Sequence, residues 1–227
     1  MARETFEAKK KRALKIIEVL KRTYPDAHCA LDHRNAFELL VATILSAQCT
    51  DVRVNMVTPV LFKKYPTAEA LAKSSQGDVE KIIQSTGFFR AKAASIRSAA
   101  ADIVEKHKGE VPRTMEELTA LRGVGRKTAN VVLGNAFDQN VGVVVDTHVG
   151  RLSQRMGLTT HTDPVKIEQE LMKLSPQGDW TLLSHLLIFH GRQICAARKP
   201  RCAKCALFEL CPSGAKFVAS GEAAGAK

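Results

Sequence analysis

Two residues in the middle of the chain could take part in covalent chemistry. Lys127 follows the segment Gly123-Val124-Gly125-Arg126, and Asp146 stands nineteen residues after it. A Gly-x-Gly turn before a helix lets backbone N–H groups point at a bound phosphate, because glycine has no Cβ and reaches positive φ without strain. Lys127 would then lie beside that anion, available as a nucleophile. Each residue also has a plainer interpretation, Lys127 as one more phosphate contact and Asp146 as a helix N-cap.

Four of the six cysteines crowd near the C-terminus with the spacing C-x6-C-x2-C-x5-C, at Cys195, Cys202, Cys205 and Cys211. In a reducing compartment such a group holds metal more often than it forms disulfides. Structural zinc sites usually present two C-x2-C pairs, and only one is present here. Four thiolates in one compact loop suit the larger core of an iron–sulfur cubane. The spacing therefore favours a 4Fe–4S cluster, with zinc as the alternative.

The charge of the chain points to a polyanionic partner. Lysine and arginine total 34 against 23 acidic residues, a net charge of +11. An excess spread over the whole chain is typical of nucleic-acid binding, and a basic protein without an anionic partner is the alternative. Arg198, Lys199 and Arg201 lie inside the cysteine loop, where they could balance an anionic cluster or contact phosphates. No apolar run approaches a membrane span and the N-terminus is not a signal peptide, so we expect a cytoplasmic or nucleoid-associated monomer.

The elements that must position these residues are predicted to be helices throughout the chain. Apolar residues recur at helical spacing, short turns separate them, and nothing requires a sheet, which predicts an all-α protein. Thr114 and Glu117 form a capping box, and Asp163-Pro164 opens another helix. Pro59 predicts a kink or an early break, and the Ala- and Gly-rich tail over 214–227 is expected to be frayed. The expected helices cover 1–22, 35–51, 51–64, 67–72, 78–85, 91–107, 114–121, 127–136, 147–156, 163–174 and 180–190, where Gly191 ends the last one.

Two turns between these helices carry polar or aromatic residues that the core does not need. Small and polar residues, Gln48 among them, abruptly replace the apolar pattern over 46–51, which simple capping would also explain. Gly87 leads into Phe88 and Phe89, and two adjacent aromatic side chains in such a turn cannot both point into one core. One of them is expected to be exposed, where it could wedge between bases or pack against a neighbouring helix.

Taken together and in order, the motifs resemble those of the endonuclease III family of helix–hairpin–helix DNA glycosylases. The matching segments are Ser-Ala-Gln-x-Thr-Asp at 46–51, Gly-Val-Gly-Arg-Lys-Thr-Ala at 123–129, Val-Asp-Thr-His at 145–148, His-Gly-Arg at 190–192 and the cysteine loop. The resemblance covers about residues 5–212. Each motif alone is weakly specific, whereas the combination is highly specific.

The resemblance implies two helical lobes with a DNA-binding cleft between them. One is a six-helix barrel over 29–140, and the other combines 1–28 with 141–213 around the cluster. The resemblance also implies a bifunctional DNA glycosylase with AP-lyase activity on oxidised pyrimidines such as thymine glycol. Lys127 would attack C1′ of a damaged nucleotide and form a Schiff base, from which the strand is cut by β-elimination. Asp146 would stabilise positive charge on the sugar and help deprotonate the lysine. The implied partner is double-stranded DNA containing damaged bases or abasic sites. The damaged base would be extruded from the duplex, with Gln48 filling the space that it leaves and Phe88 acting on the opposite strand as a wedge. The other residues implied in DNA binding are Arg122, Gly123, Gly125, Arg126, Arg198, Lys199 and Arg201.

The sequence departs from the family pattern at two of these positions. Arg122 stands where the hairpin usually carries proline, and Phe88 is bulkier than the usual wedge residue. Two other functions remain as alternatives. An adenine-type mismatch glycosylase generally lacks a lysine at the position of Lys127 and carries a further C-terminal domain. A non-catalytic iron–sulfur DNA-binding or redox-sensing module would need the hairpin and the cluster but not the pair Lys127 and Asp146. His148 and His190 are expected to be core histidines or to support neighbouring site residues.

Overall fold

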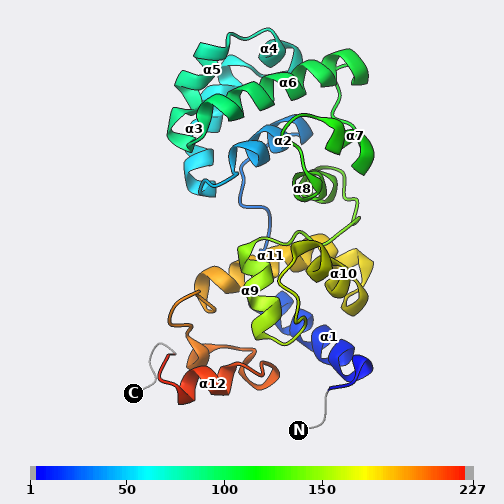
Figure 1. Cartoon of the computed structure of the whole chain (residues 1–227), viewed down its shortest axis with the longest axis vertical. Coiled ribbons are helices and arrows are strands. Elements are labelled where there is room, and N and C mark those ends of the chain that lie inside the picture. The colour runs from blue at the N-terminus through cyan, green and yellow to red at the C-terminus, as the bar shows by residue number, and fades with distance from the viewer. Residues whose placement is uncertain (1–3, 223–227) are drawn as a thin grey trace. The chain divides into compact units, whose positions relative to one another are not determined.

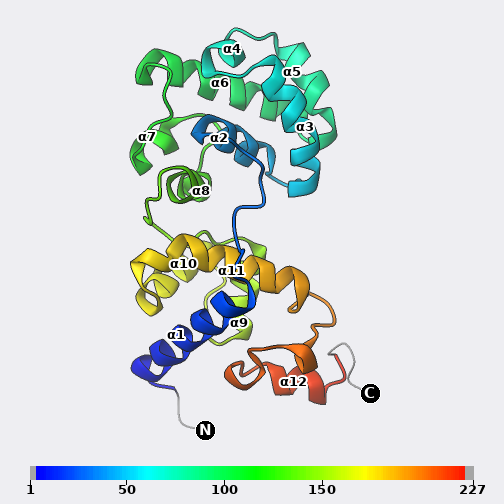
Figure 2. The same ribbon diagram turned by 180° about the vertical axis from the view of Figure 1, so that it is seen from behind.

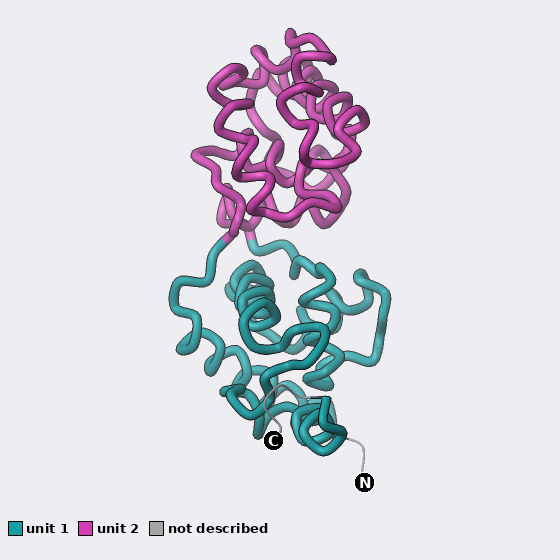
Figure 3. Tube along the Cα trace, turned by 90° about the vertical axis from the view of Figure 1, so that its left-hand side faces the viewer, with its two compact units in different colours: residues 1–28, 140–227 teal, residues 29–139 magenta. Residues whose placement is uncertain are grey.

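The computed structural model describes residues 4–222, which are helical without a β-strand (Figure 1). The expected all-α class is therefore confirmed. The chain divides into two compact units, residues 29–139 and the discontinuous set 1–28 with 140–227, of which 4–28 and 140–222 are described (Figure 3). We call the continuous one the barrel unit and the discontinuous one the cysteine unit.

The barrel unit consists of α2 to α8 around a core of aliphatic side chains. Helix α6 packs against α2, α4 and α5, and α2 packs against α8. The face that α6 buries carries Lys92, Ala93, Ile96, Ala99, Ala100 and Ile103, the spacing of one helical stripe. The elements are α2 (Ala36–Leu45), α3 (Asp51–Lys64), α4 (Ala68–Ala72), α5 (Gln76–Ile83), a short 3₁₀ turn η1 (Gln84–Thr86), α6 (Phe89–His107), α7 (Met115–Ala120) and α8 (Arg126–Ala136).

The cysteine unit joins the first helix of the chain to the last ones. Helix α1 packs against α10 and α11, and α9 packs against α11 (Figure 2). Buried side chains from all four helices, including Ile16, Leu152, Leu171 and Leu186, form one core. The elements are α1 (Phe6–Thr23), α9 (Thr147–Arg155), α10 (Pro164–Leu174), η2 (Gln177–Asp179), α11 (Trp180–Gln193), η3 (Cys202–Lys204), η4 (Phe208–Leu210) and α12 (Gly214–Ala219).

Short polar residues set most helix beginnings, as the sequence predicts. The Thr114 hydroxyl accepts the N–H of Glu117 at 3.2 Å, and Asp163 accepts that of Lys166 at 3.0 Å. These caps satisfy N–H groups that have no partner inside the helix. The same arrangement at Asn35 and Thr50 fixes the beginnings of α2 and α3 on either side of the Gln48 turn.

Several expected boundaries were wrong. Helix α2 ends at Leu45, before the polar turn. The expected bounds of α3 are confirmed, since it covers Asp51–Lys64, but the early break predicted at Pro59 does not occur, and the proline lies exposed inside the helix. Helix α11 continues through Gly191 to Gln193. The expected fraying over 214–227 is corrected for 214–219, which form α12. Residues 1–3 of the first expected helix and 223–227 of the tail lie outside the described residues.

Candidate functional site

The hairpin between α7 and α8 has the expected geometry at only one of its two glycines. Gly123 has φ of 82°, and an added Cβ would lie 2.8 Å from the Cβ of Ser95 in α6. Gly125, the N-cap of α8, has an extended backbone with φ of −96°, and nothing lies within 4 Å of its missing Cβ. Gly123 is therefore required by the turn, whereas Gly125 leaves open space in front of the helix.

Lys127 is the second residue of α8 and is exposed, as are Arg122 and Arg126 beside it. Buried Val124 anchors the hairpin between them, and its N–H donates to the Leu121 carbonyl at 3.1 Å. The first N–H groups of α8 have no intrahelical partner, so this end of the helix favours an anion. The hairpin thus presents three cationic side chains and a helix N-terminus to solvent.

The turns that carry Gln48 and Phe88 belong to the same unit as the hairpin. Gln48 is exposed between α2 and α3 with φ of 53°. Phe88 is the N-cap of α6 with φ of 45°, and 68% of its surface is exposed, whereas Phe89 is half-buried. The expectation that one of the two aromatics is exposed is confirmed. Both Gln48 and Phe88 have the left-handed backbone that side chains other than glycine rarely adopt.

Asp146 is the N-cap of α9 in the cysteine unit, and its carboxylate is held from two sides. Oδ1 accepts the backbone N–H groups of His148 and Val149, each at 2.8 Å, and Oδ2 lies 2.9 Å from His148 Nδ1. Because a carboxylate accepts, the proton of His148 belongs on Nδ1 in this contact. The side chain is 19% exposed. The structure therefore shows that Asp146 is a cap with one face of a fixed carboxylate open to solvent.

Gly191 of the His-Gly-Arg segment lets α11 approach this carboxylate site. A Cβ there would lie 3.1 Å from His148 Cδ2 and 3.1 Å from an Arg151 nitrogen. Arg151 donates to the carbonyls of Gly191 and Cys195 at 3.3 and 3.1 Å. The glycine that was expected to end α11 is thus a close-packing position, and it links Asp146 to the start of the cysteine loop.

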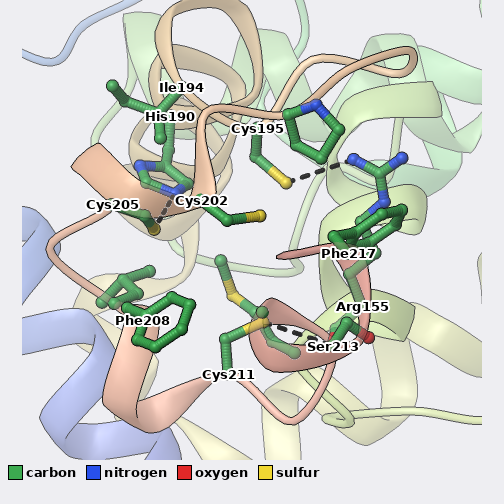
Figure 4. Close-up of a pocket in the computed structure, with 14 residues that line it drawn as sticks. Arg155, His190, Ile194, Cys195, Cys202, Cys205, Phe208, Cys211, Ser213 and Phe217 are labelled. Carbon is green, nitrogen blue, oxygen red and sulfur yellow. Dashed lines mark hydrogen bonds between the residues drawn. The ribbon is translucent and has the colours of Figure 1, made fainter. Parts of the chain in front are cut away.

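The four predicted cysteine ligands line one pocket of the cysteine unit. Figure 4 shows Cys195, Cys202, Cys205 and Cys211 arranged around a common space, with Phe208 and Phe217 at its sides. Burial raises the pKa of the Cys205 thiol to about 11 and raises the pKa of Cys202 and Cys211 as well. These three thiols are therefore protonated at neutral pH, and a metal group that binds them has to displace their protons.

Arg155 and His190 fix the cysteine loop from the helices behind it. Arg155 donates to Cys195 Sγ at 3.3 Å (Figure 4). It also donates to the carbonyls of Ala196 and Ala197 at 2.7 and 2.8 Å. His190 Nε2 lies 3.4 Å from Cys205 Sγ, and its Nδ1 lies 2.9 Å from the hydroxyl of Tyr24 in α1. Because burial lowers the pKa of His190 to about 4, the ring is neutral, so one nitrogen donates and the other accepts.

The chemistry of this pocket fits a cluster of four thiolate-ligated metals. As the side chains stand in residues 4–222, no group of three or more His, Cys, Asp or Glu is placed to hold a metal ion. The four thiols surround a space instead of converging on one point, as the ligands of a cubane do. An arginine donor to one sulfur and an imidazole beside another suit a net-negative cluster.

The remaining predicted DNA contacts are exposed, but they belong to different units. Arg198, Lys199 and Arg201 lie on the cysteine loop, where Lys199 has φ of 52°. Gln48, Phe88 and the hairpin belong to the barrel unit, and Lys127 and Asp146 fall in different units. No helix in the described part of the chain is long and apolar enough to cross a membrane.

The sequence did not identify three side chains that support predicted site residues from behind. Lys92 is buried behind the Gln48 and Phe88 turns, Arg155 holds the cysteine loop, and Tyr24 reaches His190. For Lys92 a signal exists, because it lies four residues before Ile96 on the apolar stripe of α6. Arg155 and Tyr24 act on residues 40 or more positions away, and no local pattern marks them.

Comparison with known proteins gives the family. Residues 41–177 match the HhH-GPD superfamily of base excision DNA repair proteins. The chain is 59% identical over 206 residues to the endonuclease III of Synechocystis sp., covering 91% of this chain and 94% of that protein. It is 47% identical to the endonuclease III of Bacillus subtilis, covering 85% and 88%. The chain belongs to the endonuclease III family. This family generally carries a 4Fe–4S cluster.

Solved structures of the endonuclease III family agree with this assignment. A non-covalent endonuclease III–DNA complex is 44% identical with a TM-score of 0.88, and the match covers 92% of this chain and 98% of that one. A trapped endonuclease III–DNA covalent intermediate, in an estranged-adenine complex, is also 44% identical with a TM-score of 0.86, covering 91% and 97%. The expected helix–hairpin–helix glycosylase fold is confirmed.

Proposed function

We propose that the protein is a bifunctional DNA glycosylase and AP lyase of base excision repair. It removes oxidised pyrimidines such as thymine glycol from double-stranded DNA and then cuts the strand at the abasic site. The observation that carries the proposal is the exposed Lys127 in the first turn of α8, directly behind the Gly123 turn. A relative of similar sequence has been trapped as a covalent intermediate with DNA, as a lysine nucleophile requires.

In this proposal neutral Lys127 attacks C1′ of the damaged nucleotide with its Nζ lone pair. The bond from C1′ to the base breaks, and the base leaves with the electron pair and takes up a proton. A proton then moves from Nζ to O4′, the bond from C1′ to O4′ breaks with its electron pair going to the oxygen, and the nitrogen lone pair forms the second bond of a protonated Schiff base between Nζ and C1′. Loss of a proton from C2′ then expels the 3′ phosphate oxygen, and water releases Lys127 from the unsaturated aldehyde. The nucleophile and the strand-cutting group are therefore one residue.

We assign Asp146 the stabilisation of positive charge on the sugar and the acceptance of a proton. A nearby carboxylate favours the charged form of a lysine, so the role assigned to Asp146 is not to keep Lys127 neutral. The three N–H contacts to its oxygens fix the direction in which its remaining lone pairs point. A fixed carboxylate stabilises developing charge without the cost of reorientation during the reaction.

The remaining residues are assigned to DNA binding. Backbone N–H groups at the Gly123-Val124-Gly125 hairpin, with Arg122 and Arg126, hold the phosphates of one strand. Gln48 fills the space that the extruded nucleotide leaves, and Phe88 wedges the opposite strand. Filling this space offsets part of the few kcal/mol that unstacking costs.

We further assign Cys195, Cys202, Cys205 and Cys211 as ligands of a 4Fe–4S cluster. When bound, the cluster supplies four iron–thiolate bonds that crosslink the loop, and the steps of base removal are carried by Lys127 and Asp146. The loop then holds Arg198, Lys199 and Arg201 where they contact DNA phosphates. The substrate implies that the protein acts in the cytoplasm, at the nucleoid.

Borohydride trapping tests this function. Borohydride reduces the Schiff base, so the wild-type protein should become crosslinked to a duplex that contains thymine glycol or an abasic site. Lys127→Gln should abolish the crosslink and keep most of the binding. Lys81→Gln, at an exposed lysine of α5, is the matched control and should crosslink as wild type does. A crosslink that survives in Lys127→Gln would overturn the assignment.

A further inference from the structure

A buried lysine lies behind the two turns that carry Gln48 and Phe88. Lys92, in the first turn of α6, is 5% exposed. Its Nζ donates to the carbonyl of Leu45 at 2.8 Å and to the carbonyl of Thr86 at 2.7 Å. Its backbone N–H donates to the carbonyl of Phe88 at 3.0 Å. One residue therefore contacts both turns.

The two carbonyls bound by Lys92 end separate elements of the barrel unit. Leu45 is the last residue of α2, three positions before Gln48, and Thr86 is the last residue of η1, two positions before Phe88. Carbonyls at helix ends lack an intrahelical partner and favour a cation. Burial lowers the pKa of Lys92, so the buried charge has a cost that these carbonyl contacts have to offset. If these carbonyls lay at the surface and bonded to water, they would be satisfied without the cost of a buried charge.

The backbone of both turns gives a reason for this buried cation. Gln48 and Phe88 have φ of 53° and 45°, a conformation that persists only where the surroundings enforce it. Serine and threonine hydroxyls stabilise each turn locally, since Ser46 donates to the Thr43 carbonyl and Thr86 to the Ile83 carbonyl. Those bonds stay within one turn. The Lys92 ammonium, by contrast, bonds to the last carbonyl before each turn and so links the two turns directly.

We propose that Lys92 is a positioning residue that holds the Gln48 turn and the Phe88 turn at one fixed spacing, so that both side chains enter the duplex together when the damaged nucleotide leaves the stack. This inference rests on the proposed function, because it requires that Gln48 and Phe88 contact DNA. Lys92 does not itself react, since its Nζ is buried against two carbonyls.

Helix α6 supports the third DNA-contacting segment in the same way. Gly123 of the hairpin packs against Ser95, three residues after Lys92, closely enough that a Cβ would lie 2.8 Å away. Phe88, Lys92 and Ser95 thus occupy the first two turns of one helix. Because a helix is stiff over two turns, it fixes the wedge, the filler and the phosphate-binding hairpin relative to one another.

The experiment compares one reaction on two substrates. Lys92→Met keeps an unbranched side chain and removes the ammonium donors. Single-turnover strand cleavage is measured at the same abasic site in a duplex and in a single-stranded oligonucleotide, where no stack has to be filled. We expect Lys92→Met to cleave the duplex about tenfold or more slowly than wild type, because small misplacements near a reacting centre reduce the rate by such factors. It should cleave the single strand at the wild-type rate. In a Gln48→Ala/Phe88→Ala background, Lys92→Met should cause no further loss on the duplex.

The control separates positioning from a loss of stability. Ile103→Val removes one methylene group from a fully buried residue of the same helix, away from both turns, and melting curves show how far each variant is destabilised. If Lys92→Met does not fold, Lys92→Arg gives the same comparison, because its larger cation forces the two carbonyls apart. The inference would be overturned if Lys92→Met slowed cleavage of the duplex and of the single strand equally, or if it slowed duplex cleavage further in the Gln48→Ala/Phe88→Ala background. Failure of the wild-type protein to cleave either substrate would instead overturn the proposed function and this inference with it.

Discussion

Replacing Asp146 with asparagine separates the charge of this side chain from its role as a helix cap. The amide oxygen of asparagine can accept the N–H groups of His148 and Val149 that Oδ1 now accepts at 2.8 Å. The main loss is the contact between Oδ2 and His148 Nδ1, so we expect the free energy of unfolding to fall by about 1 kcal/mol or less. Base removal should slow by about 10²–10³, the usual cost of losing one preorganised electrostatic group.

Asp146→Ala is the comparison that removes the cap as well. Its free energy of unfolding should fall by about a further 1–2 kcal/mol. Each kcal/mol lowers the melting temperature by roughly 2–4 °C. The assays are single-turnover release of thymine glycol, cleavage of a preformed abasic site, and thermal melts of both variants. The abasic site has already lost its base, so its cleavage should suffer less in Asp146→Asn than base release does. Release within about threefold of wild type in Asp146→Asn would show that the carboxylate serves only as a cap.

Three further predictions concern the hairpin, the cysteine loop and a buried histidine. Gly123→Ala should lower the free energy of unfolding by about 1–3 kcal/mol, because its backbone is left-handed and its Cβ would meet Ser95. Gly125→Ala should melt as wild type does, because no atom lies within 4 Å, and should instead weaken binding to an abasic duplex in a titration. Cys205→Ser should lose the absorption near ~400 nm expected of a cysteine-ligated cluster, and iron analysis should show less metal. Burial, with a smaller effect of His28, lowers the pKa of His185 to about 4, and His185→Gln tests its effect on stability at low pH by denaturant unfolding.

The sign of the His185 effect follows from its two pKa values. The unfolded chain takes up this proton near pH 6.5 and the folded protein only near pH 4, so the stability is complete above pH 6.5 and is lost as the pH falls toward 4. From pH 7 to pH 5 the share of this loss that comes from His185 is about 1–2 kcal/mol, and His185→Gln should remove this share while that of His190 remains. An equal pH dependence in both proteins would contradict this origin. For the hairpin and the cluster, the contradicting results are equal melting of the two glycine variants and unchanged absorption of Cys205→Ser.

Features that depend on neighbours along the chain could be predicted from the sequence. The caps at Thr114 and Asp163 need only a residue three positions ahead, and the exposure of one aromatic beside Gly87 follows from the geometry of one turn. The four cysteines were recognised because their spacing limits what they can bind. The roles in DNA repair that we propose for the site residues rest on the resemblance carried by the combination of motifs.

Features that depend on distant partners could not be predicted in this way. Gly191 has the position of a helix end in the sequence, but the close approach of His148 keeps it inside α11. The apolar stripe of α6 indicates that Lys92 is buried, but no local pattern shows that its Nζ meets the carbonyl of Leu45, 47 residues away, at 2.8 Å. Phe217 was expected in a frayed tail, whereas the Arg155 guanidinium lies 4.7 Å from the centre of its ring.

The discontinuity of the cysteine unit has a consequence for the order of events during protein synthesis. The barrel unit is continuous, so all of its residues are available once residue 139 has left the ribosome. Helix α1 is made before the barrel unit, but its partners in α10 and α11 and the bond from Tyr24 to His190 arrive about 140 to 190 residues later. Its apolar stripe therefore stays exposed while the barrel unit is translated. Helix α1 gains its native contacts late although it is made early, and the nascent chain is prone to aggregation until α11 has been made.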